Sequence, residues 1–85
     1  MRVRLLFFAR LREAFGTSSE EATLPDSVKS VADLTAWLRA RGGAWAAELA
    51  AGRAYRVAVN QDMASSETRL AEGSEVAIFP PVTGG

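Results

Sequence analysis

The feature that most constrains this chain is a single clear amphipathic helix set among short segments with strand-like alternation. The helix signal runs from residue 30 to about residue 41, and Ser30 is a suitable N-cap with an acidic residue three positions later. A glycine pair at 42–43 ends it. Its apolar stripe consists of Val31, Leu34 and Leu38. One such helix covers one face of a sheet, so the other segments have to supply that sheet.

The remaining segments supply the strands and two shorter helices. Alternation of apolar and polar side chains predicts strands over 2–8, 20–24, 55–60 and 75–79, with a further short strand after a tight turn at 60–62. Shorter helices are predicted over 9–15 and 45–51. This order predicts an α+β fold of β-grasp (ubiquitin-like) type. In that fold one mixed sheet carries the main helix across one face, and the first and last strands run parallel in its middle.

Length and composition exclude several classes of protein. The 85 residues support one domain, predicted over 1–79, followed by an extended tail over 80–85. The chain contains no cysteine and no histidine, so it has no thiolate metal site, no ordinary zinc site and no Ser-His-Asp or Cys-His machinery. We expect no bound metal and no catalytic group of the usual kind in this chain.

Charge and hydropathy indicate the cellular compartment of the chain and the classes of partner that it does not bind. Ten basic residues balance ten acidic ones, which does not favour nucleic-acid binding. The early arginines Arg2, Arg4, Arg10 and Arg12 are interpreted as a solvated local patch. The apolar run at 5–9 is too short for a signal peptide or a membrane helix. We therefore expect a cytoplasmic protein that does not bind membranes.

Two aromatic residues break the simple inward–outward pattern. Phe8 and Phe79 each end a predicted strand on the face opposite the main helix, where Leu6 and Ala77 join them. Exposed apolar patches of this kind usually mark docking surfaces. The alternative is that the strand register slips by one residue, which would bury both rings.

The tail carries a second unusual pattern. Pro80 and Pro81 favour a stiff, extended exit from the sheet, and six extended residues reach about 20 Å. Gly84 and Gly85 end the chain, and two residues without a Cβ can enter a channel too narrow for any side chain. The alternative is a frayed terminus or a cloning scar, since chain ends are commonly disordered.

The reacting group of such a tail is the α-carboxylate of Gly85. An ATP-using partner can adenylate it, and sulfur can then displace AMP to leave a C-terminal thiocarboxylate. Alternatively, an amine or a thiol can take the acyl group. None of these routes needs a histidine or a cysteine in this chain.

Three stretches resemble the small subunits of molybdopterin synthase, a family of ubiquitin-like sulfur carriers. They are residues 6–13 (LFFARLRE), residues 59–61 (VNQ) and residues 75–85 (EVAIFPPVTGG). The terminal Gly-Gly is shared with the sulfur carriers of thiamine synthesis and tRNA thiolation. The run FPPVTGG is much more particular to the molybdopterin branch.

The resemblance implies a role for each matching residue. Gly85 would carry the thiocarboxylate, and the residues that thread the tail into the partner would be Pro80, Pro81, Val82, Thr83 and Gly84. The residues that contact the large catalytic subunit would be Leu6, Phe8, Arg12 and Phe79.

The resemblance also implies a set of partners. The large subunit would supply the catalytic groups within a heterotetramer, and its substrate would be cyclic pyranopterin monophosphate. An adenylyltransferase related to ubiquitin-activating enzymes would recharge the tail with ATP, and a separate protein would donate sulfur. No cofactor would be bound permanently to this chain.

Three alternatives stay open. The chain could serve another sulfur pathway, such as thiamine synthesis or tRNA thiolation. It could be a ubiquitin-like modifier that forms isopeptide bonds. It could also be a β-grasp interaction module whose tail is inert.

Overall fold

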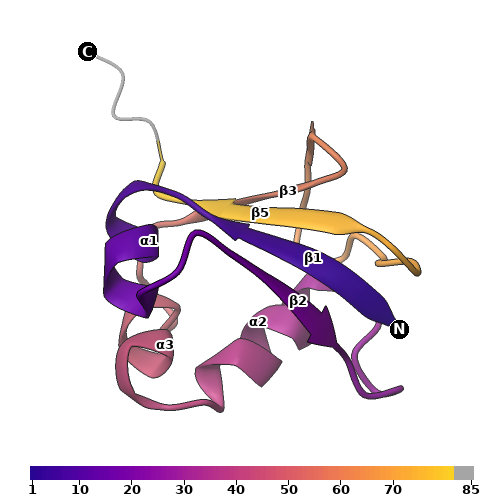
Figure 1. The fold of residues 1–85 in the computed structure, drawn as a ribbon, viewed down its shortest axis with the longest axis horizontal. Coiled ribbons are helices and arrows are strands. Elements are labelled where there is room, and N and C mark those ends of the chain that lie inside the picture. The colour runs from indigo at the N-terminus through magenta and orange to yellow at the C-terminus, as the bar shows by residue number, and fades with distance from the viewer. Residues whose placement is uncertain (82–85) are drawn as a thin grey trace.

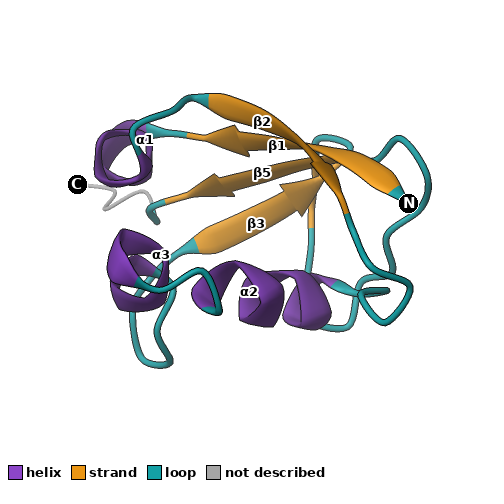
Figure 2. Cartoon of the chain, turned by 60° about the horizontal axis from the view of Figure 1, so that its bottom comes forward, coloured by secondary structure: helices purple, strands orange, loops and turns teal. Residues whose placement is uncertain are grey.

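The sheet has five strands in the order β2-β1-β5-β3-β4, in a computed structural model that describes residues 1–81. The strands are β1 (Arg2–Phe7), β2 (Ser19–Thr23), β3 (Arg56–Val59), β4 (Asp62–Met63) and β5 (Glu75–Phe79). β1 pairs with β5 in parallel, and the other neighbours pair antiparallel. Figure 2 shows the four longer strands side by side in this order. The predicted β-grasp fold, with its first and last strands adjacent and parallel, is confirmed.

Three helices accompany the sheet, namely α1 (Ala9–Phe15), α2 (Val31–Arg39) and α3 (Gly43–Glu48). α2 and α3 lie on the same side of the sheet (Figure 1). α1 has the predicted bounds, and Gly16 ends it in the left-handed conformation at φ 75°. α3 begins two residues before the predicted start and ends three residues before the predicted end. The reason is that Gly42, at φ 78°, starts the helix directly after the preceding turn.

The apolar side of the sheet packs against α2 to form the core. The alternate residues Val3, Leu5 and Phe7 are buried on β1, as are Val57 and Val59 on β3 and Val76 and Ile78 on β5. Leu34 and Leu38 meet them from α2 with no exposed surface. Burying each side chain of this size stabilises the fold by about 1.5–3 kcal/mol. The predicted inward faces of these strands are therefore confirmed.

The start of α2 is capped from both directions. The Ser30 hydroxyl accepts a hydrogen bond from the Asp33 amide at 3.2 Å. The Asp33 carboxylate accepts one from the Lys29 amide at 3.0 Å. This second bond is the main cause that lowers the pKa of Asp33 below its ordinary value. The pattern is close to a capping box, with the return bond shifted by one residue.

Stacked aromatic rings and one arginine side chain link the three helices. The rings of Phe15 and Trp45 stack at 3.8 Å, and the Arg41 guanidinium lies 4.6 Å from the Trp45 ring and 4.9 Å from the Trp37 ring. Both tryptophans pack against the core. Arg41 also donates two hydrogen bonds to Glu20 of β2, at 2.9 and 2.5 Å. Glu21, the next residue of β2, accepts a hydrogen bond from Arg2 at 2.7 Å.

Candidate functional site: an apolar patch on the open face of the sheet

The face of the sheet turned away from α2 carries an apolar row that crosses four strands. Strand register places Leu6 beside Ala77, Ala77 beside Ala58, and Ala58 beside Met63. Side chains of directly paired residues point to the same side of a sheet. This row is therefore continuous from β1 through β5 and β3 to β4.

A second row with two aromatic rings lies next to the first, at the end of the sheet where β5 stops. Phe7 pairs with Ile78 in the parallel ladder, so the following residues, Phe8 and Phe79, are neighbours on the open face. The Phe8 amide donates to the Ile78 carbonyl at 3.3 Å, which holds the two chains together at this point. Arg56 pairs with Phe79 and closes the row on the β3 side. We call Leu6, Phe8, Ala58, Met63, Ala77 and Phe79 the apolar patch.

Exposure shows that this patch faces outward. Phe8 is 47% exposed and Met63 is 65% exposed, and these are the two large apolar side chains that residues 1–81 leave exposed. Leu6, Ala77 and Phe79 are half-buried, and Ala58 is buried among its neighbours without joining the core cluster. By contrast, Phe7 is 1% exposed. The predicted patch is confirmed, and the alternative register that would bury both rings is wrong.

Met63 belongs to the patch and was not predicted. Asn60 and Gln61 form the two-residue turn between β3 and β4 with φ values of 51° and 72°, the pattern of a type I′ hairpin turn. The Asn60 side-chain carbonyl accepts from the Glu75 amide at 2.9 Å, which ties this turn to β5. The signal in the sequence is a two-residue turn that begins with asparagine. Counting residue pairs outward from that turn places Met63 opposite Ala58.

The backbone around Phe8 explains how one ring stays on the surface. Phe8 is extended at φ −125° and ψ 153°, and it forms the N-cap of α1. Its carbonyl accepts from the amides of Leu11 and Arg12. Ala9 has a φ of 52°, in the left-handed region that costs an ordinary residue about 1–2 kcal/mol. This strained turn reverses the chain directly after Phe8, so the ring remains on the open face while Leu11 enters the core with no exposed surface.

The early arginines do not form the single patch that was predicted. Arg2 and Arg4 lie on β1 at the end of the sheet far from Phe8, where Arg2 binds Glu21 at 2.7 Å. Arg10 and Arg12 lie on α1, next to the apolar patch, and both are exposed. The cause is the length of β1, because an extended strand separates the two pairs in space.

The tail begins where β5 ends, beside the patch. Pro80 and Pro81 follow Phe79 directly and are half-buried. Val82, Thr83, Gly84 and Gly85, the residues predicted to carry and thread the reacting group, lie outside the described residues. Residues 1–81 contain no cluster of acidic or other side chains suited to hold a metal ion. No helix among them has the length and apolar character needed to span a membrane.

Comparisons with known proteins agree with this geometry. The sequence pattern of the ThiS family matches residues 5–85. The molybdopterin synthase sulfur carrier subunit of Escherichia coli (strain K12) is 40% identical over 83 residues, covering 98% of this chain and 99% of that protein.

Solved structures show the same fold in two kinds of relative. A putative molybdopterin converting factor, subunit 1, from Pyrococcus furiosus superposes with a TM-score of 0.80 at 28% identity, covering 96% of this chain and 99% of the other. The small archaeal modifier protein 1 from Methanosarcina acetivorans superposes with a TM-score of 0.74 at 25% identity, covering 99% of this chain and 96% of the other.

Proposed function

This chain belongs to the ThiS family, and on that premise we propose that it is the sulfur-carrier small subunit of a molybdopterin synthase. The observation that carries the proposal is the 40% identity to such a subunit across nearly the whole of both chains. The apolar patch beside the start of the tail supports it, because a carrier has to dock on a partner while it presents its terminus.

The chemistry proposed for the tail centres on Gly85. Its carboxylate attacks the α-phosphate of ATP on an adenylating partner, which releases pyrophosphate and leaves an acyl adenylate. A sulfur donor then displaces AMP, so that a C–S bond replaces the C–O bond to phosphorus and a thiocarboxylate remains. The thiocarboxylate gives its sulfur to cyclic pyranopterin monophosphate, and water restores the carboxylate. Two such deliveries supply the two sulfurs of molybdopterin.

This chain is a sulfur donor and does not catalyse the reaction alone. It has no histidine or cysteine, so the groups that move protons belong to the large subunit and to the adenylating enzyme. ATP is consumed on that enzyme and is not a resident cofactor of this chain. We assign Leu6, Phe8, Arg12, Phe79 and Met63 to partner contact, because they lie on or beside the apolar patch.

The two partners use the same surface in this proposal. Phe8 and Phe79 lie at the end of the sheet where β5 stops and Pro80 follows, and a tail that enters one partner's pocket cannot enter another. Binding of the adenylating enzyme and binding of the large subunit therefore alternate. Pro80 and Pro81 favour a stiff, extended exit from the sheet toward either partner, and Val82, Thr83 and Gly84 are the residues proposed to thread.

The test is an intact-mass measurement. The chain is incubated with its adenylating enzyme, ATP and sulfide, and we expect one oxygen to be replaced by sulfur at Gly85. The thiocarboxylated chain, mixed with the large subunit and cyclic pyranopterin monophosphate, should then yield molybdopterin. A chain that lacks Gly85 is the matched control and should remain unchanged.

Two other outcomes would replace the proposal. An unchanged mass in an assay where the adenylating enzyme consumes ATP would indicate an inert interaction module. Attachment of Gly85 to lysines of other proteins would indicate a modifier, which is the role named for the Methanosarcina acetivorans structure.

A further inference from the structure

We propose that Arg10, Glu48 and Arg53 form a preorganised basic contact that receives acidic side chains of the large subunit beside the pocket that the tail enters. The inference rests on the proposed function and deepens it, because it specifies the charge of the partner's surface and the residues of this chain that bind that surface. Arg12 was predicted to contact the partner, but Arg53 and Glu48 were not.

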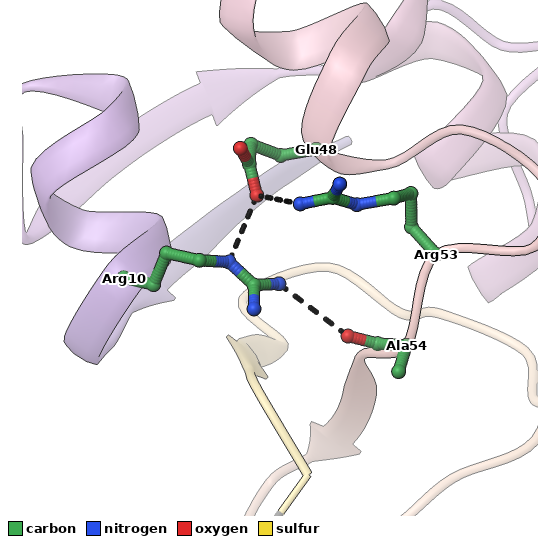
Figure 3. Close-up of polar contacts among 4 residues, drawn as sticks. All are labelled: Arg10, Glu48, Arg53 and Ala54. Carbon is green, nitrogen blue, oxygen red and sulfur yellow. Dashed lines mark hydrogen bonds and ion pairs between the residues drawn. The ribbon is translucent and has the colours of Figure 1, made fainter.

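The cluster joins α1 to α3 and to the loop that follows α3 (Figure 3). Glu48 of α3 accepts from Arg10 Nε of α1 at 2.9 Å and from Arg53 Nη2 at 3.1 Å, and both bonds fall on the same oxygen, Oε1. Arg10 Nη2 also reaches the Ala54 carbonyl at 3.5 Å. The two guanidinium groups are therefore held side by side before any partner arrives.

The charges in the cluster do not cancel. Two arginines share one carboxylate, which leaves one positive charge in excess. The Glu48 side chain is only 18% exposed, whereas those of Arg10 and Arg53 are 46% and 47% exposed. Water and partners therefore meet the cations while the anion lies beneath them. Each guanidinium has five N–H donors, and each gives only one to Glu48.

The cluster lies at the end of the sheet where the tail leaves. Arg10 follows Phe8 by two residues on α1, and α1 packs against β5. On the other side, Arg53 and Ala54 precede Arg56, which pairs with Phe79 at the end of β5. The basic residues Arg10, Arg12, Arg53 and Arg56 therefore border the apolar patch at the start of the tail.

The end of the sheet far from this cluster has the opposite balance of charge. There Glu21 faces Arg4 across β2 and β1, Glu75 faces Arg4 across β5, and Glu72 accepts from the Arg2 amide at 3.2 Å. The chain as a whole has zero net charge, and its basic and acidic groups are concentrated at opposite ends of the sheet. A polar face orients a partner during encounter more than it attracts any polyanion. This pattern favours a protein surface with acidic residues near its pocket over a nucleic acid.

Preorganisation explains why these arginines suit a contact surface. A free arginine loses side-chain freedom when a partner immobilises it, and this loss opposes binding. Arg10 and Arg53 are already held by Glu48, so that loss is smaller. Guanidinium groups also match carboxylates in a planar, two-point geometry. The chemistry expected on the partner is therefore aspartate or glutamate.

The experiment measures association of the full chain with the large subunit from the same genome at low and high salt. The double variant R10Q/R53Q should associate on the order of tenfold more slowly at low salt. The difference should shrink toward 1 M salt, where the screening length falls to about 3 Å. The matched control is R2Q/R4Q, which removes two arginines from the other end of the sheet and should associate at the wild-type rate.

A third variant separates charge from structure. E48Q removes the compensating anion and keeps both arginines, so its association rate at low salt should equal or exceed that of the wild type. If the cluster only fastened α1 to residues 53–54, E48Q and R10Q/R53Q would slow association alike, and that result would overturn the inference. Circular dichroism melts of all three variants check that each is folded.

Failure of this inference differs from failure of the proposed function. Equal association rates for R10Q/R53Q and R2Q/R4Q, with a wild-type chain that binds and yields molybdopterin, would overturn the inference alone. A wild-type chain that accepts no sulfur would overturn the proposed function and this inference with it.

Discussion

At the scale of single residues, two adjacent phenylalanines have opposite roles. Phe7 is 1% exposed and makes edge-to-face contacts with Phe15 at 5.1 Å and with Trp45 at 5.3 Å. Phe8 is 47% exposed on the open face. Successive side chains of a strand point to opposite faces, so the two rings lie on opposite sides of the sheet. The left-handed turn at Ala9 keeps the Phe8 ring on the open face where β1 ends and α1 begins.

We expect Phe7→Ala and Phe8→Ala to affect different properties. Phe7→Ala should lower the free energy of unfolding by about 3–5 kcal/mol, because it leaves a cavity among buried rings. Phe8→Ala should lower it by less than about 1 kcal/mol, as surface changes usually do, and should weaken binding of the large subunit. Urea denaturation and calorimetric titration measure the two effects. Equal loss of stability in both variants would contradict the assignment of Phe8 to the surface.

At the scale of elements, the contact between Arg41 and Glu20 links β2 to the residues that follow α2. The hydrogen bonds from Arg41 are the main cause that lowers the pKa of Glu20 below its ordinary 4.5, and burial partly opposes them. The same pairing raises the pKa of Arg41. Because both side chains are less than one-third exposed, this pair is screened by water less than the Arg2–Glu21 pair is.

The lowered pKa of Glu20 predicts how stability changes in acid. A carboxylate with a lower pKa in the folded state stabilises the fold above the unfolded value of 4.5, and it loses this effect as pH falls through the folded pKa. At pH 7 the wild type should exceed Glu20→Gln in stability by about 1 kcal/mol. The difference should vanish as pH falls below that folded pKa.

The measurement for this prediction is urea denaturation at a series of pH values. Glu67→Gln is the control, since Glu67 is exposed in the turn after β4, and its difference from the wild type should not follow this trend. A Glu20→Gln difference that stayed constant from neutral to acid pH would show that the ion pair does not contribute.

At the scale of the whole molecule, the core and the proposed site are separable. Among residues 1–81, the buried core cluster lies within residues 3–78, whereas the proposed reacting group belongs to Gly85. The apolar patch, the basic cluster and the start of the tail gather at one end of the sheet. A partner can therefore engage all three without disturbing the face that packs on α2.

Removal of residues 82–85 tests this separation. The truncated chain should melt within about 2 °C of the full chain, because no core residue is lost. It should accept no sulfur, because the reacting carboxylate is gone. Thermal unfolding by circular dichroism and intact mass measure the two properties. A large fall in melting temperature would mean that the tail packs against its own sheet, which is incompatible with threading into a partner.

The sequence alone determined the features that depend on neighbours along the chain. The period of apolar residues placed the bounds of α1 and β5 and the inward faces of β1, β3 and β5, because a side chain's direction follows from its position in a strand or helix. Composition excluded histidine and cysteine chemistry, and the terminal glycines directed attention to the α-carboxylate.

The tertiary structure decided what distant residues do together. Met63 joined the apolar patch through the register of three strands, the early arginines separated to two ends of the sheet, and Glu48 bound Arg10 of the distant α1 beside Arg53. These pairings depend on the order and register of strands far apart in sequence. Local periodicity holds no information about that order, because each strand's own pattern is the same whichever neighbour it meets.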